Sequence, residues 1–364
     1  MQKWTMRTLI LGCCLTLLPS FAQAQLFFDA EAVFLGRNNE GGTSIVSGAD
    51  PISTNSGSYG SEPGYRLTIG GIFDNLQVDG TFTQISPWTS SLDGVFNNNV
   101  DLPTGMNFDG FLNQAAQAEG DGEYLNGPGT FDVSNRSNYR DAEIMIGSSY
   151  INRRWRLAGG YRYVQLDEKN GLGIFADLDE AVPGPAAPIG LTDAALTAAG
   201  ATWLAGPADG IDAGSEIAYL IQSNTRNQMH GFQTLFGVEM LNSKWVTIEG
   251  LLKAGIYCNN MSGRVTETVA GLGPGDTSVY QRILSGNKTG AAFAGNLGLR
   301  AVIGITDYID LVGGGEVLFL SGVALGDDQA NGVNANLMGT NAYQVQNKGS
   351  LVAYGGTVGL RIFW

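Results

Sequence analysis

Cysteine and histidine are nearly absent from this sequence. The 364 residues include three cysteines and one histidine, His230. Two of the cysteines, Cys13 and Cys14, lie in an N-terminal segment that we expect to be removed, which leaves Cys258. A single thiol cannot form an internal disulfide, and no Cys/His cluster of the kind that binds transition metals is present. The exported chain must therefore be held together by burial and hydrogen bonding.

Long apolar runs are missing beyond the N-terminus. There, two basic residues precede an apolar run over 8–18, and Ala22 and Ala24 supply the small residues of a cleavage site. This pattern predicts a signal peptide over 1–24. Lipidation at Cys13 is the alternative, but it would leave a much shorter apolar region. Since a transmembrane helix needs roughly 20 apolar residues, the exported chain is either soluble or a β-barrel.

Basic residues are few relative to acidic ones. The chain has 20 Lys and Arg against 34 Asp and Glu, a net charge of −14, or −14 − 2 = −16 without the two basic residues of the signal peptide. Such an acidic chain is a poor partner for nucleic acids and for anionic lipids, which bind basic surfaces. Glycine, in contrast, is abundant at 53 residues. In strands it marks bends and close packing, which barrels require.

What the sequence does contain is alternation with period two, and it is clearest over 351–364. One set of alternate positions is apolar and carries Tyr354 and Trp364 near its two ends, whereas the other is small or polar and includes Arg361. Successive side chains of a strand point to opposite faces, and roughly ten residues of a tilted strand cross a bilayer. This stretch therefore predicts the closing strand of an outer-membrane β-barrel, with Trp364 at the periplasmic interface.

The same alternation recurs upstream, in segments whose connections alternate between long and short. The long connections lie near 36–64, 86–138, 166–223, 259–290 and 324–349. The short turns lie at 74–75, 151–153, 242–243 and 306–308. Outer-membrane barrels combine an even strand count with short periplasmic turns and long outer loops. We therefore expect an all-β fold over 25–364, a transmembrane antiparallel up-and-down β-barrel of about ten strands.

Two further elements are open at this point. Twelve strands would result if 217–222 and 278–283 formed an extra pair. A short helix is expected around 192–204.

The inward positions of the predicted strands carry many charges. The candidates to face the lumen are Asp29, Glu31, Arg66, Asp79, Asp141, Glu143, Arg156, Arg162, Glu239, Glu249, Lys253, Arg300, Asp310, Glu316 and Arg361. Isolated buried charges are very costly, so these side chains must pair or meet water. Because a barrel of about eight strands is roughly filled by its own side chains, ten strands predict a narrow or plugged lumen. Salt-bridged filling is favoured over an ion-selective pore.

Outward aromatic residues are expected to form two belts. The residues assigned to the periplasmic belt are Tyr150, Trp155 and Trp364, and those assigned to the outer belt are Phe34, Tyr65, Phe82, Tyr163, Phe232 and Tyr354. Trp245 shares the phase of Glu249 and Lys253, so either a bulge shifts its strand or it lies at the rim.

No catalytic, cofactor or metal site is predicted. His230 lies at the outer end of a strand without a neighbouring nucleophile or paired acid, so we expect no enzyme activity. Residues 327–332 partly imitate a calcium loop, but Met338 stands where that loop needs its bidentate Glu. A solvated loop is the expectation there.

Several stretches resemble the beta-barrel porin-7 family of planctomycete outer membranes. They are Phe28–Leu35, Asn224–Asn227 with the following 232–238, Trp245–Ile256 and Gly359–Trp364. The resemblance implies an outer-membrane barrel with no established transport substrate, and it brings no functional residues with it.

The expected function is accordingly that of an outer-membrane β-barrel, porin-like by resemblance, that passes small solutes. The alternatives are a non-conducting barrel for adhesion or envelope structure, and a soluble secreted β-protein. The expected partners are outer-membrane lipid and, through the strand that ends at Trp364, the barrel-assembly machinery. No nucleic acid is expected, and the oligomeric state stays open.

Overall fold

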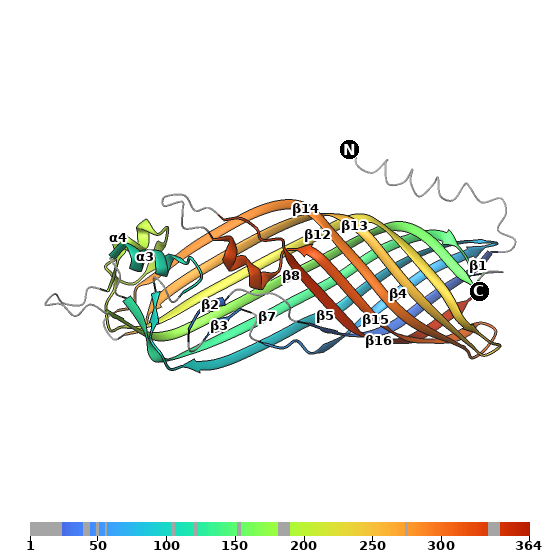
Figure 1. Ribbon diagram of the computed structural model, residues 1–364, viewed down its shortest axis with the longest axis horizontal. Coiled ribbons are helices and arrows are strands. Elements are labelled where there is room, and N and C mark those ends of the chain that lie inside the picture. Colours follow the sequence, from blue (N-terminus) through green and yellow to red (C-terminus); the bar gives the residue numbers. More distant parts are fainter. Residues whose placement is uncertain are drawn as a thin grey trace.

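A computed structural model describes residues 24–38, 44–48, 51–54, 57–102, 106–119, 123–150, 154–180, 190–273, 276–333 and 343–364. The predicted signal peptide, apart from Ala24, lies outside these residues. Long strands form an elongated barrel (Figure 1). Their bounds are β1 Ala24–Arg37, β4 Ser61–Phe73, β5 Leu76–Phe96, β7 Glu123–Ser148, β8 Trp155–Glu180, β12 Glu216–Asn242, β13 Val246–Gly271, β14 Val279–Gly304, β15 Ile309–Val323 and β16 Gly349–Phe363.

These strands close into a ring. Each is antiparallel to the next long strand along the chain, and β1 pairs with both β4 and β16. At the seam, Leu26 and Trp364 exchange two backbone hydrogen bonds of 3.1 Å. The predicted up-and-down barrel of about ten strands is confirmed. The twelve-strand alternative is wrong, because 217–222 continues β12 and 279–283 continues β14.

Short turns and long connections lie at opposite ends of the barrel (Figure 1). We call these ends the turn end, which holds the start of β1 and the C-terminus, and the loop end. The predicted turns at 74–75, 242–243 and 306–308 lie at the turn end, whereas 151–153 is outside the described residues. Asp74 adopts φ 56°, a conformation that Asp tolerates in tight turns.

Small elements lie in the loop-end half of the molecule, with α3 and α4 at the loop end itself (Figure 1). They are β2 Ser44–Val46, β3 Ile52–Ser53, β6 Val100–Asp101, α3 Phe111–Glu119, β9 Leu191–Thr192, α4 Asp193–Ala198, β10 Thr202–Ala205, β11 Gly210–Ile211 and the 3₁₀ helix η2 Gly326–Gly332. The helix expected over 192–204 is the shorter α4, and α3 carried no clear sequence signal. In the part of the chain with described coordinates, no helix is long and apolar enough to cross a membrane.

Three predicted loops were too long. The strands β5, β7, β8, β12, β13 and β14 run far into 86–138, 166–223 and 259–290. The reason is an inversion of polarity along the barrel. Near the turn end, β13 points Ile256 outward and Lys253 inward, but farther along it buries Val265 and exposes Arg264. The outward apolar signal that predicts a lipid-facing strand therefore stops long before the strand does.

Candidate functional site

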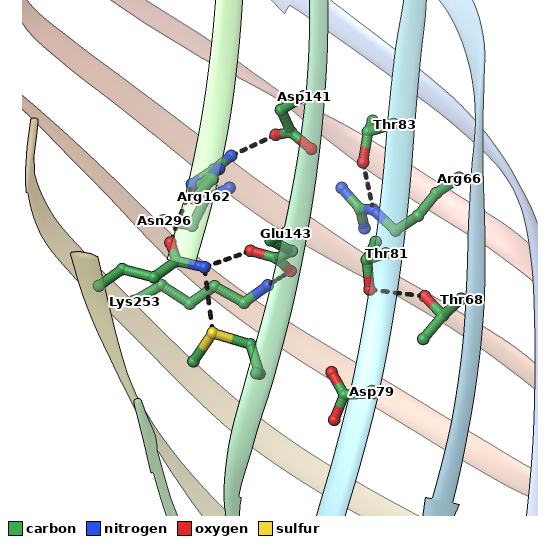
Figure 2. Close-up of polar contacts among 12 residues, drawn as sticks. Arg66, Thr68, Asp79, Thr81, Thr83, Asp141, Glu143, Arg162, Lys253 and Asn296 are labelled. Carbon is green, nitrogen blue, oxygen red and sulfur yellow. Dashed lines mark hydrogen bonds and ion pairs between the residues drawn. The ribbon is translucent and has the colours of Figure 1, made fainter. Parts of the chain in front are cut away.

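A polar cavity of about 310 Å³ occupies the barrel interior toward the turn end. Inward side chains of the strands line it, and Figure 2 shows several of them converging. The charged lining residues are Asp29, Glu31, Arg66, Asp79, Asp141, Glu143, Arg156, Arg162, Glu249, Lys253, Arg300, Glu316 and Arg361. Every one of these positions was a predicted lumen candidate.

Asp29 is the centre of the ion pairs on one wall. Its two carboxylate oxygens accept hydrogen bonds of 2.7 Å from Arg361 Nε and from Arg300. Arg300 also bonds Glu31 at 2.9 Å. Arg66 reaches across to Glu316 at 2.6 Å. These groups come from strands on both sides of the β1–β16 seam, so the network ties the closing strands together.

The opposite wall holds three more pairs. Arg162 pairs with Asp141, and Lys253 with Glu143 (Figure 2). Arg156 pairs with Asp79 nearer the turn end. Every base that lines the cavity is thus ion-paired, as burial of charge requires.

The lining carries seven acids and six bases, so its formal charge is close to neutral. Glu249 is the acid that has no ion pair within the described coordinates. It is buried near Tyr150, which also lines the cavity. This near-neutral, paired lining gives no strong preference for cations or anions.

Two lumen candidates lie outside the cavity. Glu239 sits at a bulge of β12 near the turn end, where it accepts a hydrogen bond of 2.9 Å from Asn242. Asp310 lies opposite Arg361 in the pairing of β15 with β16, near the turn-end rim. Both side chains miss the cavity for the same reason, because their strands end in turns close to these positions.

The aromatic assignments need one correction. Tyr150 lines the cavity and is not part of an outward belt, because it follows the end of β7 and folds back into the lumen. Trp155 and Trp364 are exposed at the turn end. Trp245 is also exposed, in the turn before β13, where Lys244 lies 5.0 Å over its ring. It therefore takes the rim position that was one of its two predicted options.

An apolar layer crosses the barrel beyond the cavity. It consists of buried, contacting side chains from every barrel strand except β4, together with Leu325 from the connection after β15. Its members are Val33, Leu35, Ile85, Trp88, Tyr139, Val164, Leu166, Met229, Tyr257, Ala292, Ala294, Leu318, Leu320, Val323, Leu325, Leu351 and Ala353. Because these residues approach from all sides and each is at most 5% exposed, they fill the bore.

Sequence reasoning missed this layer because it treated the inward face as uniformly polar. A signal was present, since Val33 and Leu35 share the phase of Asp29 and Glu31. Trp88 gave a misleading one, because a bulge at Ser86–Pro87 changes which positions of β5 face inward.

A buried polar network lies on the loop-end side of the apolar layer. Arg37 pairs with Glu168 at 2.5 Å, and Glu168 also accepts hydrogen bonds from Ser137 at 3.0 Å and from the backbone N–H of Gly326 at 2.9 Å. Asn227 exchanges hydrogen bonds with the backbone of Ala324 at 2.7 and 2.8 Å. The connection after β15 is thereby held inside the barrel, with η2 against β8, β12 and β13.

The calcium-like stretch 327–332 belongs to this inserted connection. It forms η2, with Asp327 and Gln329 almost fully buried, so the predicted solvated loop is wrong. Gln329 donates to Leu325 O at 2.7 Å and accepts from Tyr343 at 2.7 Å, which gives it a structural role. Met338 lies outside the described residues. No cluster of metal ligands occurs within the described ranges.

His230 lies on the outer surface and not in the lumen. Its Nδ1 is 2.6 Å from the Tyr161 hydroxyl, and its ring lies 4.8 Å from that of Tyr163. It therefore belongs to an outward aromatic cluster. This cluster lies at the edge of the apolar surface, by which we mean the outer barrel face that exposes large hydrophobic side chains such as Ile144, Leu157, Phe232, Ile256 and Leu297.

No protein-family model matches the chain. No curated protein matches it either. Among solved structures, the outer membrane protease OmpT of Escherichia coli is similar, with 10% identity and a TM-score of 0.38 over 93% of this chain and 97% of that one. A major outer membrane protein from Thermus thermophilus has 10% identity and a TM-score of 0.28 over 94% and 99%. The anion-selective porin from Comamonas acidovorans has 15% identity and a TM-score of 0.17 over 94% and 99%. Similarity of this degree tells nothing about activity or substrate, and membership of the porin-7 family stays a prediction.

Proposed function

We propose that this chain is a bacterial outer-membrane β-barrel that is closed to passive diffusion and serves as a surface or envelope-structural protein. The apolar layer across the bore is the observation that carries the proposal. An ion crossing that layer would lose its hydration without gaining a polar partner, a cost of tens of kcal/mol for a fully desolvated charge.

The outer surface near the turn end supports the membrane placement. Large apolar side chains stand exposed there, including Phe232 at 77% and Ile256 at 74%. A contiguous apolar surface of this kind is unfavourable in water but matches the hydrocarbon of a bilayer. Trp155 and Trp364 at one edge, with Tyr161 and Phe232 at the other, have the positions of interfacial belts.

This placement puts the turn end in the periplasm and the loop end outside the cell. Export would then depend on the predicted signal peptide, and insertion on the barrel-assembly machinery, which we expect to engage the strand ending at Trp364. The helices α3 and α4 would face the exterior as a compact platform.

Planar-bilayer recording tests the closed state. We expect purified, refolded protein to give no current steps under applied voltage, while a porin inserted into the same membrane gives its usual steps. Heat-modifiable migration on a gel checks that the barrel is folded. Steps of reproducible size in most insertions would contradict the proposal and favour the porin-like function.

The polar cavity is the observation that supports the porin-like function as a second candidate. With about 310 Å³ and a paired lining, it has room for a small polar solute on the periplasmic side. Passage would require the apolar layer to move, so a current that appears only on addition of a particular solute would be its signature.

A further inference from the structure

The outer face of β7, β8, β12 and β13 carries a basic patch just on the loop-end side of the apolar surface. We define the basic patch as Arg136, Arg140, Lys169, Arg226 and Arg264. All five side chains are exposed. The chain has a net charge of −14, so five bases on one face reverse the sign of the charge locally.

Strand register places three of these cations in one line across the sheet. Arg136 is opposite Lys169, Lys169 is opposite Asn224, and Asn224 is opposite Arg264. Neighbouring strands lie about 4.8 Å apart, so the three cations fall within about 15 Å. Like charges directly opposite on a sheet destabilise it, and a bound anion between Arg136 and Lys169 would remove that cost.

These cations have few internal partners. Arg226 pairs with Asp167 at 2.9 Å. The other four cations make no ion pair within the described ranges. The five bases together with Asp167 carry a formal charge of +4.

Two adjoining hollows run over the basic patch and share Lys169 and Asn224. One also contains Arg136, and the other contains Arg226 and Arg264. Exposed Ser and Asn residues add to their lining, namely Ser91, Ser134, Ser285 and Asn287, beside Asp167, which pairs with Arg226. The surface thus combines separated cations with many groups able to hydrogen-bond to hydroxyls.

The aromatic edge of the apolar surface begins next to the patch. Arg140 is two residues from Ala142, which is opposite Tyr163, and Tyr163 is opposite His230. A ligand whose phosphates reach the patch could therefore lay its acyl chains on the apolar surface toward the turn end.

We propose that the basic patch binds a phosphorylated glycolipid of the surrounding membrane leaflet. The inference rests on the proposed placement in the outer membrane. Arginine forms paired hydrogen bonds with phosphate oxygens, and the Ser and Asn side chains of the hollows fit the sugar hydroxyls. The net acidity of the chain argued against an anionic lipid, but the acids and bases are segregated, and the membrane edge of this face is basic.

Lipid retention measured by native mass spectrometry tests the proposal. The probe is diphosphoryl lipid A, mixed with full-length folded protein in detergent micelles. The test variant combines Arg136→Gln, Lys169→Gln and Arg264→Gln. We expect affinity to fall about fivefold for each cation removed, or about a hundredfold in the triple variant.

The matched control combines Arg154→Gln, Lys244→Gln and Lys348→Gln, which removes the same charge from exposed positions away from the patch. It should retain the lipid like the unaltered protein. Equal retention by the test variant would overturn the proposal, as would equal retention of phosphatidylglycerol or equal competition by inorganic phosphate. Heat-modifiable migration and membrane fractionation are read in parallel. A folded membrane barrel that retains no lipid A refutes this inference alone, whereas a chain found in the soluble fraction refutes the barrel placement first.

Discussion

Asp327 lies in an environment that departs strongly from that of an ordinary, solvent-exposed carboxyl group. It is the second residue of η2 and is 3% exposed, and its backbone oxygen accepts a hydrogen bond of 2.7 Å from the Thr54 hydroxyl. Burial, with the negative charges of Glu168 and Asp328, raises its pKa to about 8, although Arg37 opposes the shift. The titration of this carboxyl group makes the stability of the folded protein, including the connection after β15, depend on pH.

The direction of that link follows from proton binding. In the unfolded chain the carboxyl loses its proton near its ordinary pKa of 3.8, whereas the folded protein keeps the proton until about pH 8. Stability should therefore fall as pH rises from about 4 to about 8 and level off above that. We expect Asp327→Asn to match the unaltered protein at pH 4 and to have the higher thermal midpoint at pH 8.

Thermal unfolding followed across this pH range, with protease protection of the connection after β15 as a local probe, measures the effect. Asp307→Asn is the control, since that side chain is exposed in the turn between β14 and β15, at the turn end, and its removal should keep the pH dependence. Parallel pH profiles for Asp327→Asn and the unaltered protein would show that the group does not titrate as described.

At the scale of the element, β5 shows how one extra residue redirects a strand. Its partner residues in β7 step from Tyr139 to Ser137 while β5 steps from Ile85 to Trp88. The bulge contains Pro87, which fits because proline is confined to edges and bulges of sheets. It turns Trp88 into the apolar layer, where its Nε1 donates to Leu35 O at 2.7 Å.

Truncating Trp88 should open a void in the apolar layer. We expect Trp88→Ala to lower the free energy of unfolding by about 3–5 kcal/mol, as for large buried aromatic residues in general. Trp203→Ala in β10 is the matched control, because that side chain is 45% exposed, and it should cost less than about 1 kcal/mol. Denaturant titration in micelles compares them, and equal costs would mean that the layer is not tightly packed.

Sequence periodicity predicted the barrel strands where one face meets apolar surroundings and the other is polar. The alternation of Asp29 and Glu31 with apolar neighbours is an example. The prediction from periodicity failed where the polarity of both strand faces changed together. Beyond the apolar surface the outward face becomes polar and the inward face apolar, as Arg264 and Val265 show, so strand length was underestimated. The bulge at Pro87 and the inserted η2 depend on contacts distant in sequence, which periodicity does not record.

At the scale of the whole molecule, the inversion of polarity defines how deep the barrel should sit. Cys258 is exposed on β13 opposite His230, at the edge of the apolar surface. It is the thiol that the described residues offer as a depth probe. We expect a fluorophore on Cys258 in bilayers to be quenched more by nitroxides at the headgroup than by nitroxides deep in the acyl chains.

The double variant Leu252→Cys/Cys258→Ser provides the comparison, because Leu252 is exposed within the apolar surface. Its label should show the opposite preference. The same quenching at both positions, or none, would mean that the barrel does not span the bilayer at the proposed depth.

The β1–β16 seam has a consequence for how the molecule is made. Every other pairing in the ring joins long strands that follow one another along the chain, but the seam joins the first of them to the last. Hairpins can therefore form while the chain is still being synthesised, yet β1 must keep one edge open until β16 is available. An open strand edge invites pairing with other chains, and contacts between distant parts of a sequence form slowly. Closure is thus the step most exposed to aggregation, and the cell must protect this chain over nearly its whole length before any barrel exists.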